Sequence, residues 1–357
     1  MTSHGKGCGC ASGTTAGTVA SSMLAGAGAA IIAAAYLLPF WAANNESIRT
    51  FSLIFSSIML EAAPFMLLGT VAGGLIEVFV SRERMESLLP GKDWFAACVA
   101  AAMGMIFPVC ECAIVPVVRR LAGKGLPAAA AVAYLLAGPI VNPVVGLSTV
   151  LAYNFDWRPA VFRLVAGYVI AVVASLLLTG TFFRRKPLFA DGVLSSDPHA
   201  CGCSCGCGHG HEHGHHHAPN FLDRIADAGN HALDDFMATA PYLIIGAALA
   251  AAAQTGIERR LFVEAASSPA AAMAAMMLLA VLLNLCSEAD AFIAASFRGL
   301  VPFSSQMAFL VIGPMFDIKL LLMYRSLFRR GVAPILAGLV AVAVALLALG
   351  MEMTGVS

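Results

Sequence analysis

The stretch WFAACVAAAMGMIFPVCECAIVPVV, residues 94–118, decides the fold. It is apolar throughout except for Glu111, and its residues do not alternate in polarity as those of a half-buried strand would. A helix needs roughly 20 apolar residues to cross the hydrocarbon core of a membrane, so the stretch is long enough. Pro108 lies inside it, where a helix should break. The sequence therefore predicts a membrane-embedded helix that is interrupted part of the way along.

The rest of the chain has the same apolar character. The 357 residues have a mean hydropathy of +0.83, and only 12% of them are charged, against about 25% in soluble proteins. So few charges cannot build a water-exposed surface, and the net charge of zero gives no indication of nucleic-acid binding. The sequence predicts an all-α, polytopic helical membrane protein. Its other apolar runs are residues 17–43, 51–80, 126–153, 159–183, 237–254, 270–297, 303–323 and 332–351.

Four short motifs occur twice, in the same order and offset by 175 to 177 residues. The pairs are Ala63-Pro64 with Ala240-Pro241, Cys110-Glu111 with Cys286-Ser287, Leu126-Pro127 with Val301-Pro302, and Gly138-Pro139 with Gly313-Pro314. Ala-Pro and Gly-Pro are common in membrane helices, which explains one pair but not four in register. We therefore expect an internal duplication, with membrane repeats over 51–183 and 235–351.

The distribution of Lys and Arg favours one topology. If every apolar run spanned the membrane, the basic residues would divide almost evenly between its two sides. If residues 94–121 and 270–298 are re-entrant hairpins, most of them fall on one side, as the positive-inside rule requires. The second repeat is then inverted relative to the first, a common plan of transporters. The remaining expected segments are a cytoplasmic Cys/His tail at 1–16, a first transmembrane helix at 17–43 and a cytoplasmic loop at 184–231.

Cys110, Glu111 and Cys112 form the first candidate site. Residues two apart lie on opposite sides of a helix, but Pro108 and Pro116 permit a non-helical backbone in which both thiols converge. An unpaired Glu111 would cost on the order of 3 kcal/mol at the bilayer centre, which makes an intramembrane carboxylate a functional candidate. The alternative is a pair of buried cysteines beside a structurally paired glutamate.

The second repeat supplies the partner site. Superposing the repeats brings Cys286, Glu288 and Asp290 toward the first site, and thiolates with carboxylates select soft or borderline ions such as Cu(I) and Zn(II). Glu288 and Asp290 could instead pair with Arg298 or carry protons. Asn142 and Asp317 follow the paired Gly-Pro motifs and could add oxygen ligands. Lys319 could neutralise Asp317, so structural pairing is an equal alternative there.

The predicted loop 184–231 carries the clearest metal signal. Four thiols and six imidazoles within one glycine-rich segment bind soft or borderline metal ions in nearly any arrangement. A disordered loop suits ion capture, buffering or sensing better than transport. The residues are Cys201, Cys203, Cys205, Cys207, His209, His211, His213, His215, His216 and His217.

The chain encodes no energy source of its own. It has no G-x-x-x-x-G-K-[ST] phosphate loop and no stretch long enough for an ATPase domain. We expect secondary transport without a required cofactor, with protons as the coupling ion and Glu111, Glu288 and Asp290 as their carriers.

From Phe51 to about Arg330 the sequence resembles a family of two-repeat permeases that includes the trivalent organoarsenical efflux permeases and related copper/zinc efflux transporters. The resemblance rests on Cys110-Glu111-Cys112 with the following Ile114–Leu121, and on Gly138-Pro139-Ile140-Val141-Asn142-Pro143. Two features resemble the copper/zinc branch of this family: Glu111, which lies between the two cysteines, and the Cys/His-rich loop. The resemblance implies an exporter of the bacterial inner membrane, with Cys110, Glu111 and Cys112 as translocation residues.

Three readings stay open beside export of Cu(I) or Zn(II). Export of As(III) compounds would also use two or three thiolates. A metal-responsive membrane sensor would need no transport, and a thiol redox enzyme is compatible with Cys-x-Cys pairs, although it needs neither the duplication nor the oxygen ligands. We do not expect the protein to be an enzyme, and the sequence leaves open whether it forms a homo-oligomer.

Overall fold

The structure is a computed structural model that describes residues 46–79, 92–107, 109–183, 187–190, 193, 221–256 and 268–354. These residues are almost all helical, and among them the only β-type pairings are isolated bridges. Within these described ranges, five helices are long and apolar enough to cross a membrane. The prediction of a polytopic helical membrane protein is confirmed. The expected tail 1–16, the first transmembrane helix 17–43 and the Cys/His segment 201–217 lie outside the described residues.

The helices fall into two series with the same order. The first series is α2 (Glu46–Phe79), α4 (Asp93–Met103), α5 (Glu111–Gly123), α6 (Ala128–Ala137), α7 (Pro143–Ala152) and α8 (Arg158–Leu177), which ends in the π-helical turn η1 (Leu178–Phe182). The second series is α9 (Phe221–Gly256), α11 (Pro269–Leu283), α12 (Ser287–Ser296), α13 (Phe303–Met315), α14 (Ile318–Leu327) and α15 (Val332–Thr354). Breaks in the helices occur at equivalent positions, next to the repeated motifs.

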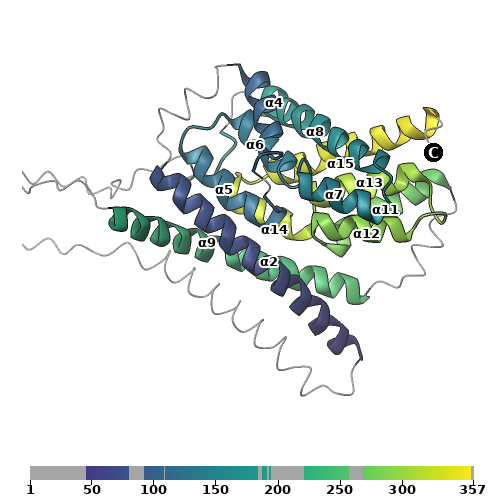
Figure 1. Cartoon of the computed structure of the whole chain (residues 1–357), viewed down its shortest axis with the longest axis horizontal. Coiled ribbons are helices and arrows are strands. Elements are labelled where there is room, and N and C mark those ends of the chain that lie inside the picture. Colours follow the sequence, from purple (N-terminus) through teal and green to yellow (C-terminus); the bar gives the residue numbers. More distant parts are fainter. Residues whose placement is uncertain are drawn as a thin grey trace, which may run out of the picture.

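The long helices extend beyond the apolar runs. α2 begins at Glu46, and α9 begins at Phe221, inside the stretch 184–231 for which the sequence predicts a loop. The start of α9 is polar but contains no proline, so a helix can continue outward from the apolar span. α2 and α9 pack against each other and lie side by side along one face of the molecule (Figure 1).

The first hairpin enters and leaves on one side of the bundle. α4 and α5 have 11 and 13 residues, about 16 and 20 Å of helix, so neither crosses a core about 30 Å thick. Both pack against α6. The end of α4 meets the end of α6, because a Cβ on Gly104 would lie 2.8 Å from the carbonyl oxygen of Val141. α4 and α6 therefore run parallel, and α5 returns along α6 to the turn that starts it.

The second hairpin has the same construction. α11 and α12 both pack against α13. Asn284 caps α11 in a left-handed conformation (φ 52°), and its amide donates to the Asp317 carboxylate just beyond the end of α13 at 2.6 Å. α11 is therefore parallel to α13, and α12 runs back. Three crossings of the bundle separate the two hairpins: α6 together with α7, then α8, and then α9. The two hairpins therefore open toward opposite sides, and the repeats are inverted.

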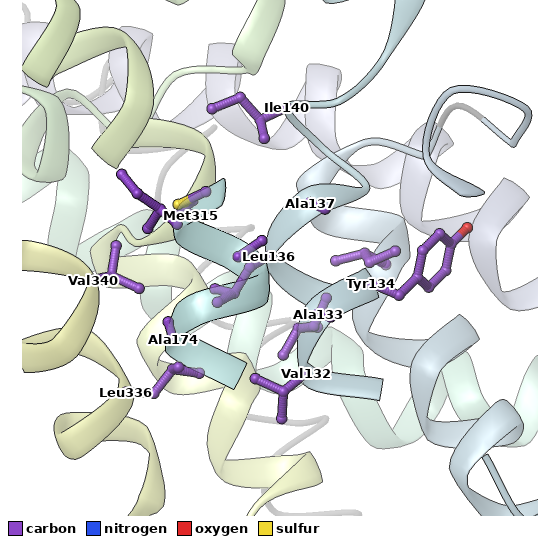
Figure 2. Close-up of a cluster of buried hydrophobic side chains, with 14 of the residues drawn as sticks. Val132, Ala133, Tyr134, Leu136, Ala137, Ile140, Ala174, Met315, Leu336 and Val340 are labelled. Carbon is purple, nitrogen blue, oxygen red and sulfur yellow. The ribbon is translucent and has the colours of Figure 1, made fainter. Parts of the chain in front are cut away.

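The core joins the two repeats. Every residue of α6 from Ala129 to Ala137 is buried. Figure 2 shows Val132, Ala133 and Leu136 of this helix among Ala174 of α8 and Leu336 and Val340 of α15. Alanine and glycine let these helices approach closely, as is usual for helix packing in lipid. The short helix α6 therefore lies inside protein and does not face lipid.

Candidate functional site

Four helices begin at the breaks, in the middle of the bundle. Their N-caps are Cys110 of α5, Asn142 of α7, Cys286 of α12 and Asp317 of α14. The Asn142 side chain accepts from the backbone N–H of Val144 at 2.8 Å, and the Asp317 side chain accepts from that of Leu320 at 2.5 Å. α5 packs against α14, and α7 packs against α12. The positive ends of four half-helices are thus gathered where the repeats meet, and they favour negatively charged side chains there.

The tip of the first hairpin is tied to the second repeat through side chains. Lys319 Nζ of α14 lies 2.5 Å from Glu111 Oε1 and 3.6 Å from Asp317 Oδ2. All three residues are at most 2% exposed. The sequence predicts Lys319 beside Asp317, and the structure adds Glu111 as its closer partner. The second carboxylate oxygen of Glu111, Oε2, is buried without a hydrogen-bond partner among the described residues.

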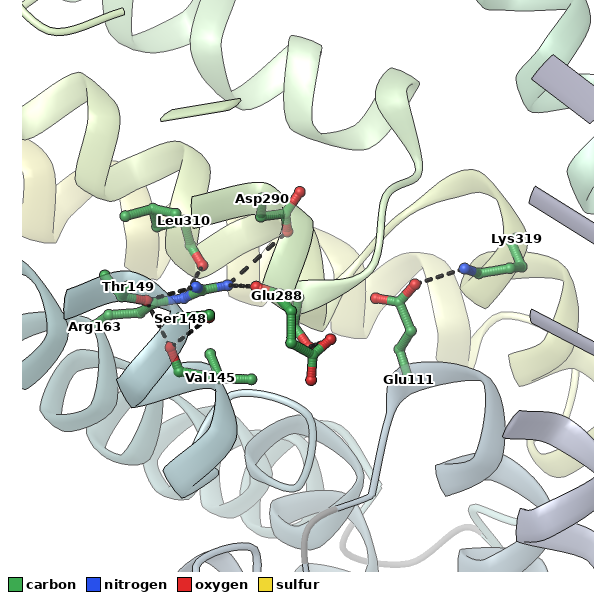
Figure 3. Close-up of polar contacts among 10 residues, drawn as sticks. Glu111, Val145, Ser148, Thr149, Arg163, Glu288, Asp290, Leu310 and Lys319 are labelled. Atoms are coloured by element: carbon green, nitrogen blue, oxygen red, sulfur yellow. Dashed lines mark hydrogen bonds and ion pairs between the residues drawn. The ribbon is translucent and has the colours of Figure 1, made fainter. Parts of the chain in front are cut away.

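The tip of the second hairpin is tied to the first repeat by Arg163 of α8, which is fully buried. Its guanidinium donates to the carbonyl oxygen of Ser287 at 2.8 Å, to that of Leu310 at 3.1 Å and to the hydroxyl of Thr149 at 3.0 Å (Figure 3). Asp290 Oδ2 lies 4.0 Å away and has no hydrogen-bond partner among the described residues. One arginine thereby joins α7, α8, α12 and α13.

Sequence reasoning missed Arg163, although the signal was present. It is a lone basic residue inside the apolar run 159–183, and intramembrane charges are functional or structural candidates by default. The alternative pairing of Asp290 and Glu288 with Arg298 is wrong for Asp290, whose cation is Arg163. Arg298 is exposed at the outer end of the second hairpin, with its guanidinium carbon 4.9 Å from the centre of the Tyr153 ring.

The cysteines mark both hairpin tips. Cys110 and Cys286 occupy equivalent N-cap positions with extended backbone (ψ 164° and 154°). The non-helical backbone that the sequence predicts between Pro108 and Pro116 is found at Cys110 only, because Cys112 and Pro116 lie within α5. Cys110 and Cys286 are half-buried, and Cys112 is 5% exposed in a cluster with Met66 of α2 and Leu243 of α9.

The described residues hold no group of three His, Cys, Asp or Glu side chains arranged for a metal ion. A shared site of Cys110, Cys112, Cys286 and Glu288 therefore stays a prediction, as does metal binding by the segment 201–217.

Comparisons with known proteins show which family the chain is similar to. Residues 47–353 match the predicted permease family ArsP_1. The UPF0718 protein YcgR of Bacillus subtilis (strain 168) is 37% identical over 277 residues, which are 78% of this chain and 88% of the relative. A protein of Streptococcus mutans serotype c, named as a candidate subunit of a two-component membrane permease complex, is 36% identical over 276 residues, 77% of this chain and 86% of its own. No solved structure matches.

The matched region contains both helix series, both hairpins and the buried junction between them. Together with the apolar helices, this identifies a multi-pass protein of the bacterial plasma membrane. The chain belongs to the ArsP_1 family of predicted permeases.

Proposed function

We propose that this permease is a secondary transporter that exports a soft or borderline metal ion, Cu(I) or Zn(II), from the cytoplasm. The ion passes between the two hairpin tips, the first contributing Cys110, Glu111 and Cys112 and the second contributing Cys286 and Glu288. The resemblance to efflux permeases supplies the direction. Thiolates beside carboxylates supply the ligand chemistry.

One observation carries this proposal: the Glu111–Lys319 contact at the junction of inverted repeats. Lys319 places a tethered positive charge against a carboxylate whose second oxygen has no hydrogen-bond partner in the described part of the chain. An arriving cation competes with this ammonium for Glu111. Transporters of this plan bind their cargo where broken helices of two inverted repeats meet.

The proposal also includes a coupling ion and a segment that captures the metal ion. Protons moving against the metal ion would use Glu111, Glu288 and Asp290, which are the acidic side chains of the two tips. The segment 201–217 would collect ions on the cytoplasmic side. The complex named for the Streptococcus mutans relative favours assembly with a second subunit, and a homo-oligomer is the other arrangement that we expect.

The test is metal content in cells that express the protein under zinc, copper or arsenite challenge. The wild type should lower the content of one ion, and Cys110→Ala and Cys112→Ala should abolish this effect. Cys98→Ala is the matched control, because Cys98 is a half-buried cysteine on α4, away from the tip. Deletion of 201–217 should preserve flux and weaken it only at low metal concentration.

Each other outcome has a meaning. If arsenite content alone falls, the substrate is a trivalent arsenical. If no ion changes in the wild type, export is refuted and a membrane sensor becomes the better description.

A further inference from the structure

The long helices α2 and α9 cover one half of the junction between the repeats. α2 packs against α5, and α9 packs against α14. Both pairs approach closely, because a Cβ on Gly69 of α2 would collide with Ala113, and a Cβ on Gly246 of α9 would lie 2.8 Å from the Cα of Lys319. α5 and α14 both run from the junction toward the side on which the first hairpin opens. α2 and α9 therefore cover the junction on that side.

The duplication predicts the same contacts in the other half, and the described helices do not make them. The equivalents of α5 and α14 are α12 and α7, which run from the junction toward the opposite side. In the described part of the chain, neither α9 with α12 nor α2 with α7 forms a comparable packing contact. In Figure 1 the first residues of α2, drawn in purple, diverge from α7 and α12. The positions of α2 and α9 therefore break the symmetry of the inverted repeats.

The exposure of equivalent side chains follows this asymmetry. Lys319, in the first turn of α14, is 2% exposed, whereas Val144, its equivalent in α7, is 50% exposed. Leu147 and Leu151 of α7 are exposed as well, while their equivalents in α14 are half-buried. The described residues thus leave uncovered the face of α7 that corresponds to the covered face of α14.

An ion pair joins α5 to α9 on the covered side. Arg120 Nε, near the end of α5, lies 2.5 Å from Asp235 Oδ2 of α9, and Asp235 is buried. A Cβ on Gly73 of α2 would lie 3.5 Å from the Arg120 side chain, so all three helices meet at this pair. The other half cannot form its counterpart, because the equivalents of Arg120 and Asp235 are Ser296 and Ile58.

We propose that α2 and α9 move together between the two halves of the junction, and that the Arg120–Asp235 ion pair is a latch that holds them against α5 and α14. In the second position α2 packs against α7 and α9 packs against α12, which are the contacts that the duplication implies. Inverted-repeat transporters expose one site to the two sides of the membrane in turn by such rocking. This rests on the proposed function, because it supplies the motion that transport needs.

The pivot of this movement is the contact of α9 with the second hairpin. The amide of Gln254 donates to the carbonyl oxygens of Leu282 at 3.2 Å and Leu283 at 2.8 Å, at the junction end of α11. The latch lies at the other end of the membrane-spanning part of α9. The Lys/Arg distribution makes the latched side cytoplasmic, so the conformation described is closed to the cytoplasm.

The test is the reactivity of two native cysteines toward a membrane-impermeant maleimide, added to either side of vesicles that contain the full chain. Cys112 is buried in one cluster with residues of α2 and α9, and Cys286 is half-buried at the second tip. Asp235→Asn should speed the labelling of Cys112 from the latched side about tenfold, a shift of about 1.4 kcal/mol in the equilibrium. It should slow the labelling of Cys286 from the opposite side. Mass spectrometry of the labelled peptides measures both rates.

Asp234→Asn is the matched control, because Asp234 is the exposed neighbour of Asp235 on the same helix. Exchanging the charges, with Arg120→Asp and Asp235→Arg in one protein, should return both rates toward those of the wild type. Thermal unfolding of each variant checks that it is folded.

The outcomes separate this inference from the proposed function. If a folded Asp235→Asn protein is labelled like Asp234→Asn, the latch is refuted. If Cys112 gains reactivity while Cys286 loses none, the ion pair only holds α5 in place, α7 simply faces lipid, and the movement is refuted. Labelling needs no transported ion, so a wild type that exports no metal would refute the proposed function and leave the latch standing.

Discussion

The two hairpin tips are held by different kinds of contact. Lys319 holds the first tip through a side chain, at 2.5 Å from Glu111. Arg163 holds the second tip mainly through backbone, by donating to the carbonyl oxygen of Ser287, while its only carboxylate partner among the described residues stands 4.0 Å away. A soft or borderline cation competes for a carboxylate more effectively than for a neutral carbonyl oxygen, so the side-chain ion pair is the easier of the two contacts to release. The first tip is thus built to respond to an ion, and the second to stay in place.

The largest expected effect comes from removing the fixed contact. Arg163→Met leaves two carbonyl oxygens and a hydroxyl without their donor and leaves Asp290 buried without its cation, and breaking such a buried charge contact costs about 3–5 kcal/mol. Arg163→Lys should not rescue it, because an ammonium cannot reproduce the planar fork. We expect little folded protein in the membrane, measured by thermal unfolding in detergent.

Arg158→Met is the control, since Arg158 is exposed at the start of the same helix. A stable Arg163→Met protein would show that the two tips do not differ as described.

A smaller effect is expected at the first tip. Lys319→Met leaves Glu111 and Asp317 facing each other without a cation and should destabilise more than Glu111→Gln, which leaves Lys319 with Asp317. The double variant should recover about 0.5–3 kcal/mol relative to the sum of the single changes, as residues in direct contact do. A double-mutant cycle on unfolding midpoints measures this coupling. Strict additivity would mean that the pair contributes nothing to stability and would weaken its proposed role.

The smallest effect is expected at the N-caps. Asn142→Ala removes one hydrogen bond to the first turn of α7 and should cost about 1 kcal/mol. Asp317→Asn keeps an oxygen for the Leu320 N–H but weakens the interaction with Lys319, so it should lower transport more than stability. Measuring the unfolding midpoint and the flux of both variants distinguishes a residue that only caps a helix from one whose charge contributes to transport. Equal losses of flux would place both residues in the same role.

The sequence predicts the architecture better than the contacts. Apolar runs, repeated Gly-Pro and Ala-Pro motifs and the Lys/Arg distribution are local signals, and they give the membrane class, the duplication and the hairpins. Asn142 and Asp317 are found at equivalent broken-helix positions for the same reason. Partners far apart along the chain are not encoded locally: Glu111 and Lys319 are 208 residues apart, and Arg163 and Ser287 are 124 apart.

The position of Arg163 has a consequence for how the protein is made. Two of its partners, Ser287 and Leu310, are translated 124 and 147 residues after it. At about 5–20 residues per second, a ribosome needs roughly 7–30 s to reach the later one. During that interval the nascent first half carries an arginine that cannot yet meet them, and α6 has its neighbours α4, α5 and α8 but still lacks α13. The first repeat is therefore expected to wait, close to the translocation machinery, until the second has been synthesised.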